Sequence, residues 1–189
     1  GYSEAFAASA PLGMILGIPL HGYDSASHDY VTRAAGSFNQ TVTGVKKLLR
    51  YGVNIEIRIV VSRLTAGYID KIADFITKEM PGISRVRIIG LEMLGNAAIN
   101  SDDVWLPYAD AFAASRKAIL HLITAGIEVG LYGFPLCSVD EAFRLLCAQG
   151  ITSYKVRFAD VCETCGEKDA CGGIFAGTYR FAAKDVRPI

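Results

Sequence analysis

Three cysteines cluster in the segment 160–175, whose sequence is D-V-C-E-T-C-G-E-K-D-A-C-G-G-I-F. They are Cys162, Cys165 and Cys171, with the spacing C-x2-C-x5-C-G-G. A thiolate is a soft ligand, so clustered cysteines favour zinc, copper(I) or an iron–sulfur cluster. The C-x2-C spacing lets two sulfurs reach one ion or cluster from a single turn, and the paired glycines let the backbone come close. The pattern therefore predicts a metal site rather than three free thiols in an ordinary loop.

A fourth thiolate would complete a [4Fe–4S] or [2Fe–2S] centre. Cys137 lies in the sequence F-P-L-C just after an expected strand, and we favour it as the fourth ligand. Cys147 is the competitor, but it lies near the end of an expected short helix, the setting of a small buried hydrophobic side chain. Zinc is the alternative metal, because a structural zinc ion also takes four thiolates. A zinc ribbon usually supplies two C-x2-C pairs, whereas this chain has one.

The composition narrows the class of protein. The chain has 189 residues, 51% of them hydrophobic, which is enough for a sizeable core. Its formal net charge is zero, so nothing favours nucleic acid or an anionic membrane surface as a partner. No apolar run is long enough to cross a bilayer, and the first ten residues do not resemble a signal peptide. Five cysteines, three of them in one loop, fit a reducing compartment, so we expect a cytoplasmic protein.

The apolar pattern predicts four strands that alternate with helices. We expect strands over 14–20, 54–61, 85–90 and 127–132, and helices over 37–51, 68–80, 108–125 and 139–146, with Ser37 as an N-cap. This order predicts an α/β fold with right-handed parallel crossovers. Four such units are about half of an eight-unit barrel, although they also fit part of a doubly wound sheet. Residues 1–150 would form this partial (β/α) barrel, and 151–189 an irregular cysteine-rich tail.

Both architectures place their working face at the carboxyl ends of the strands. The polar residues expected there are His21, His28, Asp29, Ser62, Arg63, Glu92, Asn96 and Cys137. Glu92 follows an apolar strand, and a partly buried carboxylate needs a partner, either a ligand amine or an arginine. Arg58 lies mid-strand. If the Arg58 side chain faces inward, its guanidinium would bind a carboxylate through two N–H donors. If it faces outward, it would have no chemical role. A histidine in a loop is more often a surface or capping residue than an acid or base.

The ordered set of these segments resembles the radical S-adenosylmethionine (SAM) proteins, nearest to the His-Xaa-Ser system radical SAM maturases. The segments are I-P-L-H-G-Y-D, H-D, G-S-F, I-E-I-R-I-V-V, L-E, G-N-A, P-L-C, C-x2-C-x5-C-G-G-I-F and the closing R-P-I. The resemblance implies a (β/α)6 partial barrel that binds SAM and a [4Fe–4S] cluster, with an auxiliary cluster on the C-terminal cysteines. It also implies a peptide or protein substrate. Arg58 and Glu92 would contact SAM.

The chain departs from this family in one respect. The radical-generating cluster of the family needs C-x3-C-x2-C, and no three cysteines here have that spacing. We therefore expect the C-terminal part of such an enzyme, with an N-terminal half or an oligomer partner covering the open sheet edge. A non-catalytic, zinc-stabilised half-barrel that binds a peptide or protein is the alternative. A hydrolase or synthase with incidental cysteines is weaker, because no G-x-S-x-G occurs.

Overall fold

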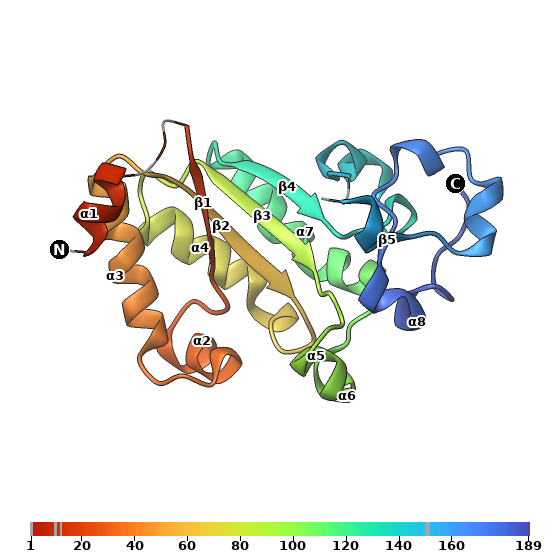
Figure 1. Cartoon of the computed structure of the whole chain (residues 1–189), viewed down its shortest axis with the longest axis horizontal. Helices are drawn as coiled ribbons and strands as arrows, with labels where there is room; N and C mark the ends of the chain where they lie inside the picture. Colours follow the sequence, from red (N-terminus) through yellow and green to blue (C-terminus); the bar gives the residue numbers. More distant parts are fainter. Residues whose placement is uncertain (1, 10, 12, 150–151) are drawn as a thin grey trace. The chain divides into compact units, whose positions relative to one another are not determined.

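The structure, a computed structural model, describes residues 2–9, 11, 13–149 and 152–189. Its main sheet has the strand order β1 (Ile15–Pro19), β2 (Asn54–Val61), β3 (Arg85–Gly90) and β4 (Glu128–Tyr132) (Figure 1). The helices are α1 (Tyr2–Ser9), α2 (Ser25–Thr32), α3 (Ser37–Arg50), α4 (Ile69–Glu79), α5 (Asn96–Ile99), α6 (Ser101–Val104), α7 (Tyr108–Thr124) and α8 (Tyr179–Ala182). Two short strands, β5 (Val156–Arg157) and β6 (Ile174–Phe175), form a separate antiparallel pair. The expected α/β fold with a parallel four-stranded sheet is confirmed.

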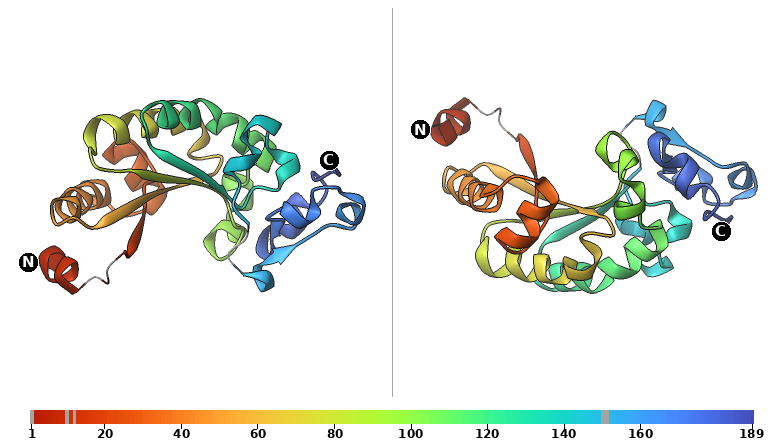
Figure 2. Two further views of the ribbon diagram at one scale, coloured as in Figure 1. Left: turned by 90° about the horizontal axis from the view of Figure 1, so that it is seen from above. Right: turned by 90° about the horizontal axis from the view of Figure 1, so that it is seen from below.

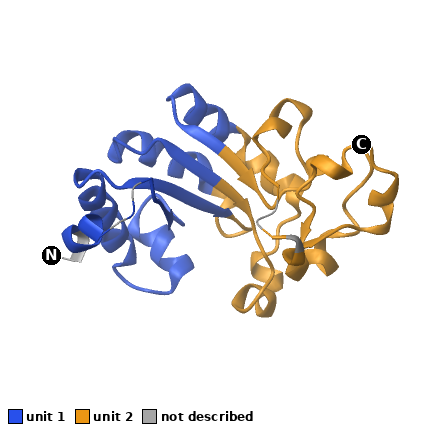
Figure 3. Ribbon diagram, turned by 45° about the horizontal axis from the view of Figure 1, so that its top comes forward, with its two compact units in different colours: residues 1–60, 68–87, 117–129 blue, residues 61–67, 88–116, 130–189 orange. Residues whose placement is uncertain are grey.

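The chain forms two compact units (Figure 3). Unit 1 consists of residues 1–60, 68–87 and 117–129, and unit 2 of residues 61–67, 88–116 and 130–189. The cysteine-rich tail thus belongs to the same unit as the ends of β3 and β4. The boundary that we expected between residues 150 and 151 lies outside the described residues.

The strands bury one face against helices and leave the other more open. In β2 the residues Ile55, Ile57, Ile59 and Val61 are almost completely buried, as period-two alternation requires for a helix-covered face. The opposite face of β2 carries Glu56 and Arg58. Because consecutive strands are neighbours, right-handed crossovers place their helices on the same face of the sheet. Figure 2 shows α4 and α7 together on one face.

The outer edge of β1 contains a proline that lacks the usual donor. The Leu20 N–H donates to the Arg58 carbonyl across the β1–β2 ladder, at 2.9 Å. Successive residues of a strand direct their N–H and C=O groups to opposite sides, so the backbone groups of Ile15, Gly17 and Pro19 point away from β2. Proline is tolerated at such an edge because the missing N–H faces outward. Pro19 is accordingly the last residue of β1.

Several short helices were not predicted. Helix α2 lies where we expected a loop, although Asp24 and Ser27 form a reciprocal capping box that signals its start. Helix α1 has no amphipathic pattern but is rich in alanine, the best helix former. Helices α5 and α6 each have four residues and lie between β3 and α7, where we expected no helix. The segment Glu141–Leu146 is a 3-10 helix rather than an α-helix.

The expected N-cap of α3 was wrong. Gly36 is the N-cap, and the capping carboxylate comes from Asp29 of α2. It accepts hydrogen bonds from the Gly36 and Phe38 N–H groups, at 2.6 and 2.8 Å, and from the Ser37 hydroxyl at 2.8 Å. The Phe38 bond leads the contacts that hold the pKa of Asp29 below its ordinary value. Asp29 therefore has a structural role, because it ties α2 to the start of α3.

The Asp29→Ala variant should lower the melting temperature by roughly 3–6 °C, because two amides at the start of α3 lose their acceptor. Thermal unfolding followed by circular dichroism at pH 7.5 measures this change. Asp70→Ala is the matched control, since this partly exposed first-turn carboxylate of α4 accepts from the Lys71 N–H and the Lys117 ammonium and caps no neighbouring helix in the described part of the chain. Equal losses in both variants would contradict the capping role.

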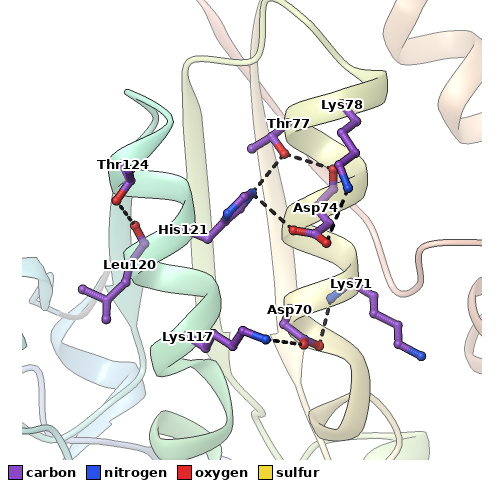
Figure 4. A network of polar contacts seen from close by, with 9 residues as sticks. All are labelled: Asp70, Lys71, Asp74, Thr77, Lys78, Lys117, Leu120, His121 and Thr124. Carbon is purple, nitrogen blue, oxygen red and sulfur yellow. Dashed lines mark hydrogen bonds and ion pairs between the residues drawn. The ribbon is translucent and has the colours of Figure 1, made fainter.

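Polar contacts join α4 to α7 within unit 1 (Figure 4). His121 Nε2 lies 3.1 Å from the Thr77 hydroxyl and 3.4 Å from the Asp74 carboxylate, and Lys117 lies 3.5 Å from Asp70. The charged side chains are between 41% and 84% exposed, and exposed pairs contribute roughly 0–1 kcal/mol each. The contacts fix which faces of the two helices meet, and the apolar residues beneath them supply most of the stability.

Candidate metal centre and charged strand face

The four cysteines that we favoured as ligands line one cavity in unit 2. Cys137 lies just past β4, in the 3-10 turn Leu136–Ser138. Cys162 lies in the 3-10 turn Asp160–Thr164, and Cys165 and Cys171 directly follow this turn and the turn Lys168–Ala170. The cavity is small, about 20 Å³, which is the space of about one water molecule. Folding therefore brings Cys137 to the same cavity as the distant C-x2-C-x5-C segment.

Backbone donors converge on the sulfur of Cys171. The N–H groups of Leu136 and Gly173 both lie 3.4 Å from Cys171 Sγ. The side chains of Lys168 and Arg187 also border the cavity. Donors and positive charges of this kind stabilise thiolates, which are the form of cysteine that binds metals. The sequence could not indicate these donors, because their placement depends on how the tail folds back onto the end of β4.

Cys147 does not line this cavity. The backbone of Cys147 forms an isolated parallel bridge with Leu131 of β4. The N–H of the next residue, Ala148, donates to the Leu131 carbonyl at 2.8 Å. Burial raises the pKa of the Cys147 thiol to about 12, which makes it a poor source of thiolate. Burial also raises the pKa of Cys137, and the nearby Cys171 and Cys162 add to this shift. The segment around Cys147 therefore serves to cover the outer edge of β4.

The four thiols share a cavity without converging on one point. Within the described ranges, no three His, Cys, Asp or Glu side chains are placed to hold a single metal ion. The donor set nevertheless fits a soft metal, since four thiols border the same cavity and two N–H groups point at one sulfur. A cluster keeps its thiolates further apart than a single ion does, whereas the small volume of the cavity suits a single ion.

Tight packing holds the tail against the ends of β3 and β4 within unit 2. The buried Thr178 hydroxyl accepts from the Met93 N–H at 3.0 Å and donates to the Leu91 carbonyl at 3.3 Å. Phe175 lies so close to Gly133 that a Cβ at this glycine would approach its ring to 2.1 Å. The rings of Phe181, Trp105, Tyr108 and Phe134 form a continuous series of aromatic contacts, with centroids 5.6 to 5.8 Å apart. These contacts position the cysteine turns.

Glu92 lies just after β3 and is half-buried. No arginine or lysine pairs with its carboxylate in the part of the chain that the structure describes. Burial raises the pKa of the neighbouring Tyr108 far above its ordinary value, and the charge of Glu92 adds to this effect. Of the two roles that we considered, pairing with an arginine is therefore not seen.

Arg58 belongs to a chain of ion pairs on the more open face of the sheet in unit 1. Its Nε lies 2.9 Å from Glu56, and the other Glu56 oxygen lies 3.1 Å from Arg87 Nε. Arg87 in turn lies 2.7 Å from Glu128, which also binds Arg85 at 3.0 Å. The Arg87 hydrogen bond, followed by that of Arg85, holds the pKa of Glu128 below its ordinary value. Alternation along β2 places Glu56 on the same face as Arg58, whereas the pairing of Glu56 with Arg87 depends on the neighbouring strand.

The two histidines after β1 make contacts that hold the fold together. His28 is buried on α2, and its Nδ1 accepts a hydrogen bond from the His21 N–H at 3.2 Å. Its ring packs against Phe38, with centroids 5.7 Å apart. Burial lowers the pKa of both histidines below 6.5, and the neighbouring His28 contributes to the shift of His21. His28 is therefore a neutral acceptor in the folded chain rather than a loop or surface residue.

These lowered pKa values predict that stability falls as the pH decreases below 6.5. The unfolded chain takes up a proton on each histidine in this range, whereas the folded chain resists protonation, so acid favours unfolding. Asp24 and Asp29, whose pKa values lie below 3.8, weaken the fold only at much lower pH. Urea denaturation at intervals from pH 7.5 to pH 5 measures the dependence.

His28→Asn is the informative variant for this dependence, because its Oδ1 replaces the Nδ1 acceptor and does not titrate. Its stability should change less between pH 6.5 and pH 5 than that of the wild type. An equal change in the two proteins would contradict the role of His28.

The other polar residues expected at the strand ends contact the protein itself. The Ser62 N–H donates to the Thr65 hydroxyl at 2.9 Å. Arg63 donates to the Trp105 and Asp102 carbonyls, at 3.2 and 3.1 Å, and so fixes the segment that contains α6. Asn96 is exposed at the start of α5. These three residues have no place in the metal centre.

Comparisons with known proteins give no family for this chain. No family model matches it, and no curated protein matches it. Among the described residues, no helix is both long and apolar enough to span a membrane.

Proposed function

We propose that the chain is the C-terminal part of a radical SAM enzyme that modifies a peptide in the cytoplasm. In this proposal Cys137, Cys162, Cys165 and Cys171 hold an auxiliary [4Fe–4S] cluster. The observation that carries it is that these four thiols line one cavity, with two N–H groups directed at Cys171. The cluster would orient the substrate or pass an electron.

The proposal gives SAM contacts to Arg58 and Glu92. For Arg58 the support is that its terminal nitrogens, Nη1 and Nη2, make no hydrogen bond or ion pair within the described residues. Glu92 supports it because its carboxylate has no cationic partner there. A guanidinium is suited to a carboxylate, and a carboxylate to an amine. Each residue is available to a ligand within its own unit.

The radical-generating cluster must come from another segment, since the chain contains no C-x3-C-x2-C sequence. The partner that we propose is an N-terminal half-barrel or an oligomer partner that adds a strand to β1. The outward backbone groups of Ile15 and Gly17 are suited to a further strand, and the missing N–H of Pro19 would end that pairing.

Metal analysis of anaerobically purified protein tests the proposal. We expect brown protein that contains iron and acid-labile sulfide. Colourless protein with one zinc ion per chain would overturn it and support the alternative, a zinc-stabilised half-barrel that binds a peptide or protein. The small volume of the cavity favours that alternative.

Turnover of SAM is the second test. With reductant, the reconstituted 189-residue chain should release no 5′-deoxyadenosine, because it lacks the triplet of cysteines that generates the radical. Release of 5′-deoxyadenosine by this chain alone would overturn the assignment of radical generation to another segment.

A further inference from the structure

Gly17 stands in the middle of β1, where glycine is a poor strand residue. Glycine weakens a strand relative to alanine, and it often marks a place where another group comes close. Gly17 is paired with Glu56 across the β1–β2 ladder, so the two residues share a face of the sheet.

The group that comes close to Gly17 is the guanidinium of Arg58. A Cβ at Gly17 would lie 2.4 Å from both Cζ and Nε of Arg58 and 2.8 Å from its Nη2. The guanidinium therefore occupies the space that any other residue at position 17 would fill. The obstructing atoms are the end of a flexible side chain, so Gly17→Ala should displace Arg58 without disrupting the strand.

Glu56 fixes the orientation of the same guanidinium. It binds Nε of Arg58, which leaves Nη1 and Nη2 as the exposed end of the fork. Glu56 is itself held by Arg87, whose other partner is Glu128. Among the described residues, this chain of ion pairs joins three arginines to two glutamates, so its arginines carry one more charge than its glutamates balance. The side chain of Arg58 is 49% exposed, compared with 12% for Arg87 and 30% for Arg85, so the surplus charge is most accessible there.

We propose that Gly17 and Glu56 are positioning residues for Arg58. Gly17 leaves room for the guanidinium against β1, and Glu56 sets its rotation, so that both terminal nitrogens face one carboxylate of a ligand. This inference rests on the proposed role of Arg58 in SAM binding. It adds that two residues which need not touch the ligand decide how strongly the carboxylate is held.

The test compares two ligands that differ in the carboxylate. S-adenosylhomocysteine has the amino acid end of SAM, and 5′-methylthioadenosine lacks it. Calorimetric titration of the whole chain gives both dissociation constants, and the measured quantity is that of 5′-methylthioadenosine divided by that of S-adenosylhomocysteine. We expect this ratio to fall about tenfold in Gly17→Ala and in Glu56→Gln, the loss of one hydrogen bond to a charged group. Gly44→Ala is the control, since nothing lies within 4 Å of a Cβ at this glycine. A merely structural role would weaken both ligands equally and leave the ratio unchanged, which would overturn the inference.

A second measurement needs no adenosyl ligand and separates this inference from the proposed function. The Nε–Hε signal of Arg58, assigned from its absence in Arg58→Lys, is followed by NMR during titration with acetate. We expect saturable shifts in the wild type and at least several-fold weaker binding in Gly17→Ala. If neither adenosyl ligand binds the wild type, the SAM proposal fails, and the acetate titration then decides the positioning role. Equal acetate affinities in the wild type and Gly17→Ala would overturn that role.

Discussion

The Cys171→Ser variant should lose its bound metal, whereas Cys147→Ser should keep it. Cys171 is the best supported of the proposed ligands, because the Leu136 and Gly173 N–H groups both point at its sulfur. Serine keeps the size of the side chain, but its oxygen is a hard ligand that suits a soft metal poorly. Changes to groups that only support metal ligands reduce affinity about 10–100-fold, so loss of a ligand should cost at least that much.

Cys147→Ser is the matched control because Cys147 does not line the cavity. Iron, sulfide and zinc are measured on both variants after anaerobic purification, together with circular dichroism to verify folding. Loss of metal from Cys147→Ser with full retention in Cys171→Ser would exchange the roles of the two cysteines. Retention in both folded variants would contradict the proposed metal centre.

The Gly133→Ala variant should show the largest loss of stability among the glycine positions compared here. Gly133 has φ of +70°, and its missing Cβ leaves room for the Phe175 ring of the tail. A left-handed alanine costs about 1–2 kcal/mol, and overpacking adds about 1–3 kcal/mol. We therefore expect a loss of about 2–5 kcal/mol in the free energy of unfolding, a large share of a typical domain's stability.

Gly126→Ala separates the two contributions. Gly126 has φ of +79°, but nothing lies within 4 Å of a Cβ there, so only the backbone strain remains. Urea denaturation of both variants gives the difference, which reports the contact between the tail and the end of β4. We also expect Gly133→Ala to bind less metal, because Phe175 and Cys171 belong to the same tail. Equal losses of stability in the two variants would show that Phe175 moves away without cost.

The regular part of the fold was predictable because its signals are local. Alternation in 54–61 and 85–90 and the apolar periodicity of 37–51 and 108–125 each reflect burial against a neighbouring layer. The predicted bounds differ from β2 and β3 by no residue and from α3 by one. Helix α2 was missed because its burial pattern is short. The cap of α3 was assigned to Ser37 because the true acceptor, Asp29, lies in another helix.

The candidate site likewise has features that the sequence reveals and features that only the folded chain shows. The spacing of Cys162, Cys165 and Cys171 follows from the chemistry of thiolates and is visible in the sequence alone. The separation of Cys137 from Cys147 rested on local context, and the structure then placed only Cys137 at the cavity. The same limit applies to Arg58, because Gly17, which leaves room for its guanidinium, and Arg87, which binds its partner Glu56, lie on other strands.

The sequence by itself determined the order of the four main strands and the long helices between them, the parallel sheet and the cysteine pattern, because residue type and period act over a few neighbouring positions. Only the tertiary structure decided which thiols share a cavity, which amides point at Cys171, and which glycine leaves room for Arg58. Those contacts join segments that are far apart in the chain. Their geometry depends on how strand ends and the tail pack together, and no local pattern encodes it.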